Sequence, residues 1–512
     1  ERLFLQACSE VMEDAGYTAS NLVVPHGRHQ RRKVGVFVGV MHNDYTIIGA
    51  ESITTGERFP LSINYAPIAN RVSYYYNFHG PSLAIDTVCS SSLTAVHLAI
   101  GSILRGESQV AIAGGVNLSL HPNKYLTYGL MDMHASDGRC HTFGDGGDGY
   151  VSGEGIGAVL LKPLKRAVQD QDHIYAVIKG SAINHGGKVS GFTVPSPVAH
   201  SHVIEECLER AGIGARTISC VEAHGTGTSL GDPIEIQGLA KAYAQNTSDL
   251  QFCSIGSVKS NIGHAESAAG ISGLSKVVLQ LHHKTLVPSL HAETENPHIN
   301  FKASPFFVQH KTETWQQPVI TSNGKSHSCP RRAGLSSFGA YGSNAHLILE
   351  EYIPQTVGSM AAGDTKNSPV LIPLSAKNEE RLRVYANKLH TFLEEADQSI
   401  DLRQIAYTLQ FGREAMEARV VFLVKKNEEL HEKLKAFAGG ESITNHCWQG
   451  GLKQEKKTIS LFSPEDIQQM VNKWIAEGKL EKLAELWAQG FTLNWQSLYE
   501  EGDSQHVGCA DG

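Results

Sequence analysis

The stretch Asp86-Thr-Val-Cys-Ser-Ser-Ser-Leu93 places a cysteine at the point where a predicted strand runs into a predicted helix. Apolar residues at 82–88 predict the strand, and apolar spacing over 90–104 predicts a helix that ends before Gly106. Cys89 would then face the first turn of the helix, whose unpaired N–H groups and dipole favour a thiolate. We therefore expect a lowered thiol pKa and a candidate nucleophile, although a small buried packing residue would fit the same pattern.

Short apolar strands alternate with longer helical patterns between residues 32 and 350. Further strands are predicted at 34–40, 109–113, 156–162 and 175–180. This alternation predicts a layered α/β domain with buried mixed sheets.

A second segment, Val221-Glu-Ala-His-Gly-Thr-Gly-Thr-Ser-Leu-Gly-Asp-Pro-Ile-Glu235, combines a strand end, a glycine-rich loop and a helix start. We expect Asp232 to be the N-cap of that helix and Glu235 to complete a capping box. The loop before it contains His224. A lone histidine is more often a structural residue, but its position between a strand end and glycines favours a function.

Two further segments have the same strand–loop–helix or strand–loop–strand character. Ser257-Val-Lys-Ser-Asn-Ile-Gly-His-Ala-Glu266 contains His264, with Lys259 five residues before it as either a surface lysine or a charge beside a site. Residues 334–349 form a glycine-rich loop whose N–H groups could hold an oxyanion, and we interpret His346 after it as structural. Because ligands in α/β folds collect at strand ends, we expect these segments to converge.

Composition narrows the class of protein. The chain of 512 residues has 44 Lys and Arg against 52 Asp and Glu, a formal net charge of −8, and is not expected to bind nucleic acid or a membrane. Its nine cysteines include no C-x-x-C pair, which favours reduced thiols in a cytoplasm over disulfides or a zinc site. We find no secretion signal and no apolar run of roughly 18–20 residues. We therefore expect a cytoplasmic protein without a bound metal.

The composition changes after residue 352. We expect a main domain at 1–352, a linker at 353–369 rich in small residues, and a small α/β domain at 370–450. The C-terminal segment 451–512 contains several aromatic residues, which we expect to pack back on the main domain. The first 16 residues already show helical periodicity without a preceding cap, which indicates a piece of a longer protein.

At these motifs the chain resembles the ketosynthase domains of modular polyketide synthases. The resemblance rests on four motifs: Thr87-Val-Cys-Ser-Ser-Ser-Leu93, His224-Gly-Thr-Gly-Thr228, Lys259-Ser-Asn-Ile-Gly-His264 and Ser337-Phe-Gly-Ala-Tyr-Gly-Ser-Asn-Ala-His346. It implies a thiolase-like five-layer αβαβα domain, normally a homodimer, followed by a small α/β linker domain. Two features depart from the family pattern: its first strand would precede Glu1, and Val88 stands where alanine is commoner.

The resemblance implies a β-ketoacyl synthase that performs a decarboxylative Claisen condensation. In that reaction Cys89 accepts an acyl chain from an acyl carrier protein. The N–H groups of Cys89 and Phe338 form the oxyanion hole, while His224 and His264 donate hydrogen bonds to the enolate of a malonyl-type extender.

The remaining roles also follow from the resemblance. Thr226 and Thr228 would bind the phosphopantetheine arm of the carrier protein, and Lys259 would position His264. No directly bound cofactor is required. The expected partners are the acyl carrier protein, neighbouring modules of the synthase and a second copy of the chain.

Two segments, Met41-His-Asn-Asp-Tyr45 and Gly49-Ala-Glu51, resemble synthases whose acyltransferase acts in trans, and residues 353–512 contain no G-x-S-x-G motif. Several alternatives stay open at this point. A non-elongating ketosynthase only transfers acyl chains and typically lacks the first histidine, whereas His224 is present. A free-standing fatty-acid ketosynthase would not carry the residues after Tyr352, and a thiolase would use a second reactive cysteine. A docking or scaffold domain would not need the intact Cys89.

Overall fold

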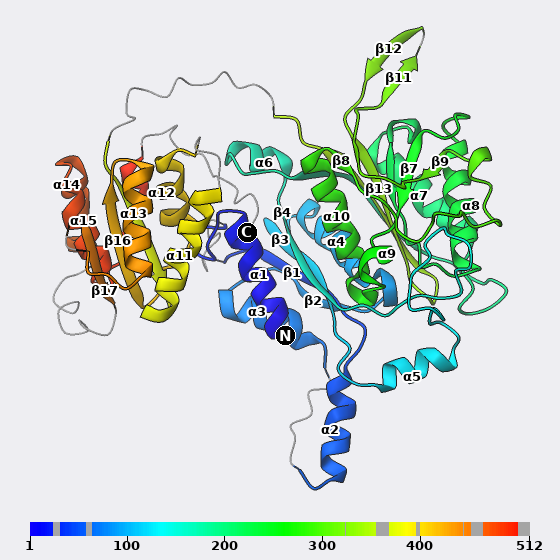
Figure 1. The fold of residues 1–512 in the computed structure, drawn as a ribbon, viewed down its shortest axis with the longest axis horizontal. Coiled ribbons are helices and arrows are strands. Elements are labelled where there is room, and N and C mark those ends of the chain that lie inside the picture. Colours follow the sequence, from blue (N-terminus) through cyan, green and yellow to red (C-terminus); the bar gives the residue numbers. More distant parts are fainter. Residues whose placement is uncertain are drawn as a thin grey trace. The chain divides into compact units, whose positions relative to one another are not determined.

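The computed structural model describes residues 1–23, 31–57, 64–322, 324–354, 368–395, 400–443, 445–451 and 464–499. The chain divides into two units (Figure 1). The large unit comprises Glu1–Val11, Val23–Leu164 and Ile174–Pro354, and the small unit comprises Met12–Leu22, Lys165–His173 and Gln355–Gly512. Two short segments of the expected main domain therefore group with the small unit. Most of the expected linker at 353–369 lies outside the described residues.

The first sheet of the large unit has four strands in the order β2-β1-β3-β4. Strands β2, β1 and β3 run parallel, and β4 is antiparallel to β3. Every residue of β1 is buried, as its continuous apolar sequence predicts. The strands are β1 (Val34–Gly39), β2 (Ser82–Ile85), β3 (Val110–Asn117) and β4 (Gly155–Leu161).

The second sheet has six strands in the order β5-β14-β13-β6-β7-β9. Strands β13, β6, β7 and β9 run parallel to one another, while β14 is antiparallel to both β13 and β5. The strands are β5 (Ala176–His185), β6 (Cys220–Glu222), β7 (Cys253–Gly256), β9 (Phe306–Val308), β13 (Arg332–Phe338) and β14 (Ser343–Glu351).

Two helices, α4 (Ser91–Leu104) and α10 (Ala269–His283), lie between the two sheets. Their apolar side chains form one core with inward-facing residues of both sheets, including Phe37 and Leu335. The helices approach closely because a Cβ at Gly270 would lie 2.9 Å from the Leu93 nitrogen. A helix that is buried between two sheets must carry apolar or small residues over most of its surface, and α4 does.

Helices also cover both outer faces of the sheets. On the first sheet, α3 (Ala66–Tyr76) packs on β1 and β2, and Phe4 of α1 (Arg2–Asp14) lies against Gly114 of β3. On the second sheet, α7 (Pro197–Ala211) and α8 (Gly231–Ala244) complete a second core. The layers are therefore helix, sheet, helix, sheet, helix, and the predicted five-layer αβαβα architecture is confirmed.

The remaining elements of the large unit connect these layers. They are α2 (Asp44–Thr54), α5 (Asn123–Leu130), α9 (Lys259–Ile262), β8 (Thr285–Leu286), β10 (Glu313–Thr314), β11 (Val319–Ser322) and β12 (Lys325–Ser328), and α6 (Leu164–Gln169) runs into the small unit.

The small unit is built on one antiparallel sheet in the order β15-β16-β17. Alternate residues of its strands point to opposite faces, so Phe422 belongs to one core and Val421 to another. The first face is covered by α11, α12 and α13, and the second by α14 and α15. The elements are β15 (Val370–Ala376), α11 (Glu379–Glu395), α12 (Leu402–Phe411), β16 (Ala418–Val424), α13 (Asn427–Ala438), β17 (Cys447–Gly451), α14 (Pro464–Ala476) and α15 (Leu480–Ala488).

The aromatic residues of the C-terminal segment lie in the second core of the small unit. Trp487, Phe491 and Trp495 pack there with Leu371 of β15. Arg419 of β16 reinforces this contact, because its Nη1 donates to the carbonyls of Trp487 and Phe491 at 2.9 Å each. We expected these aromatics on the main domain, but the sheet of the small unit has a second apolar face that needs a cover. The boundary expected at residue 450 therefore falls inside one packed unit.

The first core of the small unit gives a stability prediction. Leu382 of α11 is fully buried, so Leu382→Ala should lower the free energy of unfolding of this unit by about 2–5 kcal/mol. Val384→Ala on the same helix removes a side chain that is 43% exposed and should change it by less than about 0.5 kcal/mol. Urea unfolding followed by tryptophan fluorescence measures this, because four of the five tryptophans lie in the small unit. Equal effects of the two substitutions would contradict the assigned core.

Candidate active site

Cys89 lies in a single 3₁₀ turn, Val88–Ser90, that leads directly into α4. The predicted strand ends earlier than expected, at Ile85, and the turn fills the gap. Val88 has a φ of 57°, which is an outlier for a β-branched residue. Its N–H donates to Asp86 Oδ1 at 3.0 Å, and this contact helps to hold the turn. The backbone before Cys89 is thus strained, as is common at functional sites.

Burial dominates the electrostatics of the Cys89 thiol. Loss of solvent, and secondarily the negative charge of Glu266, raises the pKa of Cys89 to about 12, while the charge of Lys259 acts in the opposite direction. The expectation of a lowered pKa was therefore wrong. The helix dipole stabilises the thiolate by only about 0.3–1 kcal/mol, which burial outweighs. The resting nucleophile is a neutral thiol.

The loop between β13 and β14 packs directly on the Cys89 turn. A Cβ at Gly339 would lie only 2.5 Å from the Thr87 carbonyl oxygen, so only glycine permits this approach. Ser337 Oγ donates to the Cys89 carbonyl at 2.8 Å and fixes the contact. The loop thereby brings the N–H of Ala340 within hydrogen-bonding reach of the thiol, beside the N–H of Cys89 itself.

Phe338 occupies a different place from the one expected. Its N–H donates to His224 Nδ1 at 3.3 Å and is therefore not directed at the thiol. The second N–H beside Cys89 belongs to Ala340, two residues later in the same loop. The glycine-rich motif predicted an oxyanion-binding loop but not which of its peptide groups turns toward the sulfur, because that depends on the turn conformation.

The His224 loop is held by two buried carboxylates. Helix α8 begins at Gly231, so Asp232 lies in its first turn and is not the N-cap. Asp232 accepts N–H bonds from Phe143 at 2.8 Å and from Gly227 at 3.1 Å. Glu235 accepts the N–H groups of His224 at 2.7 Å and of Gly225 at 2.8 Å. The predicted capping box was wrong because these carboxylates serve the buried loop and not their own helix.

The two histidines lie together, as the sequence motifs predict, with ring centroids 5.5 Å apart and ring planes at 84°. His224 Nδ1 accepts from the Phe338 N–H, and His264 Nδ1 accepts from the Glu266 N–H at 3.0 Å. A neutral imidazole whose Nδ1 accepts carries its proton on Nε2. His264 Nε2 is buried without a hydrogen-bond partner among the described residues. Both rings thus present an Nε2–H donor.

The protonation state of the histidines follows from burial and a nearby cation. Desolvation, and then the charge of Lys259, lowers the pKa of both His224 and His264 well below its usual range. Lys259 is itself buried at the start of α9, where burial lowers its pKa and the carboxylates of Glu222 and Glu235 raise it. Of the two interpretations of Lys259, the structure favours the charge beside a site.

A buried ion cluster, missed by the sequence analysis, holds the residue that orients His264. The Glu266 carboxylate lies 2.7 Å from Lys124 Nζ and 2.9 Å from His42 Nε2. His42 also contacts the Tyr128 hydroxyl at 2.9 Å. His42 belongs to the segment 41–45 that the sequence analysis noted only as a subfamily feature. Nothing in the spacing of these residues indicates that they meet.

The site contains one cavity of about 460 Å³. Cys89, His224 and His264 are all on its wall. Thr226 and Thr228 line it as well, with their hydroxyl oxygens 3.2 Å apart. Lys259 is not among the lining residues.

Other lining residues were not predicted. The His200 ring stacks on Phe338 with centroids 3.7 Å apart, and Tyr150 lies edge-on to His264 at 4.9 Å. His200 lies outside the glycine-rich segments, whereas Tyr150 lies in the glycine-rich stretch 144–155, whose composition alone does not connect it to the site. His346 is buried in β14 with its Nδ1 3.0 Å from Ser336 Oγ and is absent from the lining, which fits the structural interpretation.

Among the described residues, no helix is long and apolar enough to cross a bilayer. All eight described cysteines are free thiols.

Family models match three stretches of the chain. Residues 1–167 match the model described as "Beta-ketoacyl synthase, N-terminal domain" and residues 175–293 match "Beta-ketoacyl synthase, C-terminal domain". Residues 373–441, in the small unit, match "RhiE-like, KS-MAT linker domain". The two synthase models cover the Cys89, His224 and His264 motifs.

Similar proteins and structures agree with these matches. The chain is 62% identical to the polyketide synthases PksM and PksL of Bacillus subtilis (strain 168) over 98% and 99% of its length, but spans only 12% and 11% of those proteins. Among solved structures, the ketosynthase from module 6 of the bacillaene synthase of Bacillus subtilis 168 is 40% identical with a TM-score of 0.85. That match covers 99% of this chain and 83% of the other.

The raised pKa of Cys89 predicts a distinct pH dependence of alkylation. The rate of Cys89 modification by iodoacetamide should rise about tenfold per pH unit between roughly pH 7 and 9 without levelling, because the thiolate fraction stays small throughout. Peptide mapping of the alkylated chain measures this rate, with free glutathione as the reference. The alkylation rate of glutathione levels off near the pKa of its own thiol. A plateau below about pH 8 would show that the helix dipole prevails over burial.

Proposed function

Because the chain belongs to the β-ketoacyl synthase family, as a ketosynthase domain of the kind found in modular polyketide synthases, we propose that it elongates an acyl chain by decarboxylative Claisen condensation. The observation that carries this proposal is the cavity on which the Cys89 thiol and the Nε2–H donors of two neutral imidazoles converge. The protein is an acyltransferase-type enzyme, and its substrates are thioesters on the phosphopantetheine arm of an acyl carrier protein.

The first half-reaction loads the chain onto Cys89. The thiol sulfur attacks the carbonyl carbon of the incoming thioester, and the bond to the phosphopantetheine sulfur breaks. The proton that leaves Cys89 is taken up by the departing thiolate, so the balance needs no external base. The oxyanion of the tetrahedral intermediate is stabilised by the N–H groups of Cys89 and Ala340, which the loop after Phe338 holds beside the sulfur.

The second half-reaction forms the carbon–carbon bond. A malonyl-type extender loses CO2, and the negative charge that remains on the thioester oxygen is stabilised by the Nε2–H groups of His224 and His264. The carbanion carbon then attacks the Cys89 thioester, the bond to the Cys89 sulfur breaks, and the departing thiolate takes a proton from water. Because both Nδ1 atoms already accept backbone N–H bonds, the imidazoles act as donors and not as bases.

The hydroxyls of Thr226 and Thr228 are proposed to hydrogen-bond the amide groups of the phosphopantetheine arm. Both line the cavity on the loop that holds His224, so an arm bound there would be aligned with the donors. Exposed Phe192 and Tyr341, whose rings stack at 4.9 Å, also line the cavity and give it an apolar wall. Lys259 is proposed to keep His264 neutral and so to act as a positioning charge.

The two alternative functions are less well supported. A ketosynthase that only transfers acyl chains needs the N–H donors beside the Cys89 sulfur but not two imidazole donors. In this chain His224 is present, and a hydrogen bond at its Nδ1 fixes the ring. A docking or scaffold domain needs no cavity that combines a thiol with two imidazoles.

The partners follow from the proposed reaction. They are the acyl carrier protein, neighbouring modules of a cytoplasmic assembly line and, indirectly, an acyltransferase acting in trans. A second copy of the chain is also proposed, since a synthase homodimer needs an apolar contact face. Helix α5 offers one, because Leu126 is 67% and Leu130 88% exposed.

The proposed roles of thiol and imidazole predict separable losses. Cys89→Ala should abolish acyl loading, whereas His224→Ala should retain loading and lower the rate of condensation by about 100- to 1000-fold. Intact-protein mass after exposure to acyl-carrier-protein thioesters measures loading, and chromatography of the β-ketoacyl product measures condensation.

A matched control is Cys447→Ala, which removes a partly exposed thiol in the small unit and should leave both steps unchanged. Near-normal condensation by the His224 variant would refute the assigned role of its imidazole.

The charge of Lys259 predicts a shift in the pH profile. With Lys259 present, the pKa values of both imidazoles are lowered, so the rings stay neutral in mildly acidic solution. Lys259→Met removes the cation and raises both pKa values, so the acid limb of the condensation rate should move to higher pH. Lys241→Met, an exposed lysine on α8, is the control and should leave the profile in place. An unchanged acid limb in the Lys259 variant would argue against an electrostatic role.

A further inference from the structure

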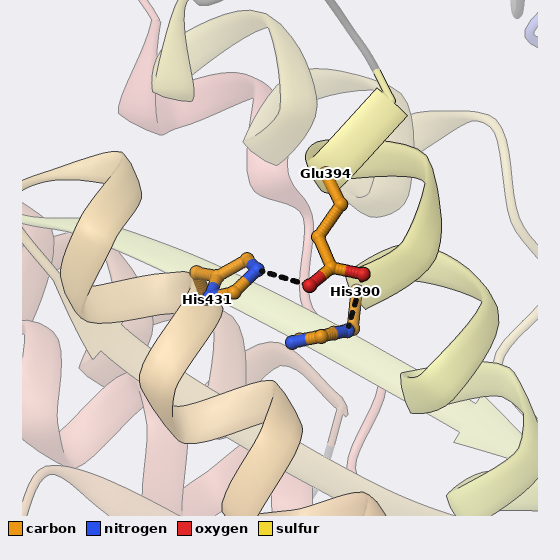
Figure 2. Close-up of side chains that lie close together, drawn as sticks. All are labelled: His390, Glu394 and His431. Carbon is orange, nitrogen blue, oxygen red and sulfur yellow. Dashed lines mark ion pairs between the residues drawn. The ribbon is translucent and has the colours of Figure 1, made fainter.

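We propose that His390, Glu394 and His431 form a binding site for a divalent transition metal, most suitably Zn²⁺, that connects two helices of the small unit (Figure 2). His390 and Glu394 lie one turn apart on α11, and His431 faces them from α13. This site is independent of the condensation reaction. The absence of C-x-x-C pairs predicts no zinc site, whereas the donors here are two imidazoles and a carboxylate.

The Glu394 carboxylate forms an ion pair with each histidine, one through each of its two oxygens. Glu394 Oε2 lies 3.7 Å from His390 Nδ1, and Glu394 Oε1 lies 3.5 Å from His431 Nε2. Both separations exceed the roughly 2.7–3.2 Å of an N–H···O hydrogen bond. Ligand atoms at about 2.0–2.2 Å from a tetrahedral Zn²⁺ are separated from one another by about 3.3–3.6 Å. Each residue offers one donor atom, and these atoms lie within 4.8 Å of one another. Small side-chain rotations would therefore bring all three to coordination distance of one ion.

Two rigid helices carry the donors. Leu382 and Ala386 anchor α11, Leu430 and Leu434 anchor α13, and all four are fully buried in the first core of the small unit. The backbone positions of the three donors are therefore fixed by packing, and a bound ion needs only side-chain adjustment. This lowers the entropy cost of forming the site.

The imidazole of His390 is largely buried at the site. His390 is 8% exposed and presents its Nδ1 to the Glu394 carboxylate. Its ring lies 4.0 Å from the ring of His431, so one ion can reach both imidazoles, and the carboxylate of Glu394 would balance part of its charge.

The other side of the site is open. The Glu394 side chain is 53% and that of His431 33% exposed, so an ion can enter from solvent and water can complete the coordination. Two imidazoles and one carboxylate with an open position form a recognised Zn²⁺ donor set. We expect the bound ion to hold α11 against α13 and so to stabilise the small unit. A ligand that binds only the folded state raises the free energy of unfolding.

The test uses the full chain, freed of metal with a chelator and kept reduced, and titrates it with Zn²⁺ alone. We expect one Zn²⁺ per chain that is lost in His390→Gln/His431→Gln, and at least about tenfold weaker binding in Glu394→Gln. The tryptophan-monitored Tm of the small unit should rise by several degrees with Zn²⁺ in the native chain and not in Glu394→Gln. Glu394 is exposed, so this variant is not expected to disturb folding.

Two controls separate this site from others in the chain. Cys89→Ala removes the thiol from the active-site cavity, which is also lined by His224 and His264, and should leave the Zn²⁺ stoichiometry unchanged. His446→Ala disrupts a comparable exposed histidine–glutamate pair, at 3.4 Å from Glu481 in the same unit, and should also change nothing. Co²⁺ bound at the proposed site should lack the thiolate charge-transfer band in the near ultraviolet.

Two results would overturn the proposal. One is Zn²⁺ binding of equal stoichiometry and affinity in the native chain and the double histidine variant. The other is no detectable binding by the native chain at about tenfold molar excess of Zn²⁺.

Discussion

His224 and His264 each accept a backbone N–H at their Nδ1 atom, and the chemistry of the site depends on these two hydrogen bonds. Because a neutral imidazole carries one proton, an occupied Nδ1 leaves that proton on Nε2. The donors are the peptide groups of Phe338 and Glu266, so the fold itself and not a mobile side chain fixes the tautomer. Glu266 is in turn anchored by Lys124. The cavity therefore contains preorganised donors for a negatively charged oxygen.

Burial then determines which charges the cavity contains at rest. Desolvation raises the pKa of the Cys89 thiol and lowers that of His224 and His264, so all three groups are driven toward their neutral forms. The nearby carboxylate of Glu235 is also buried, but it accepts two backbone N–H bonds. Negative charge that develops during a reaction thus meets fixed donors in a region from which solvent is largely excluded, where such donors are most effective.

The sequence predicts those features that depend on local pattern. It locates the strand–helix junction at Cys89, the loops of His224 and His264 and the layered fold, because periodicity and glycine placement determine them. It does not predict the sign of the thiol pKa shift, since burial is a property of the whole fold. It assigns Asp232 to a helix cap because that pattern is common, whereas the folded chain uses the carboxylate to hold a distant loop. Contacts such as Lys124 with Glu266 leave no local signal.

The geometry also separates the donors of the two half-reactions. The N–H groups beside the sulfur come from the turn of Cys89 and from Ala340, whereas the imidazole donors come from the loops after β6 and β7. In the proposed reaction, loading an acyl chain needs only the first set, and decarboxylation needs the second. A chain without His224 would retain the first set and, in that scheme, could still accept an acyl chain. The presence of both sets in one cavity is therefore the structural argument for elongation over simple transfer.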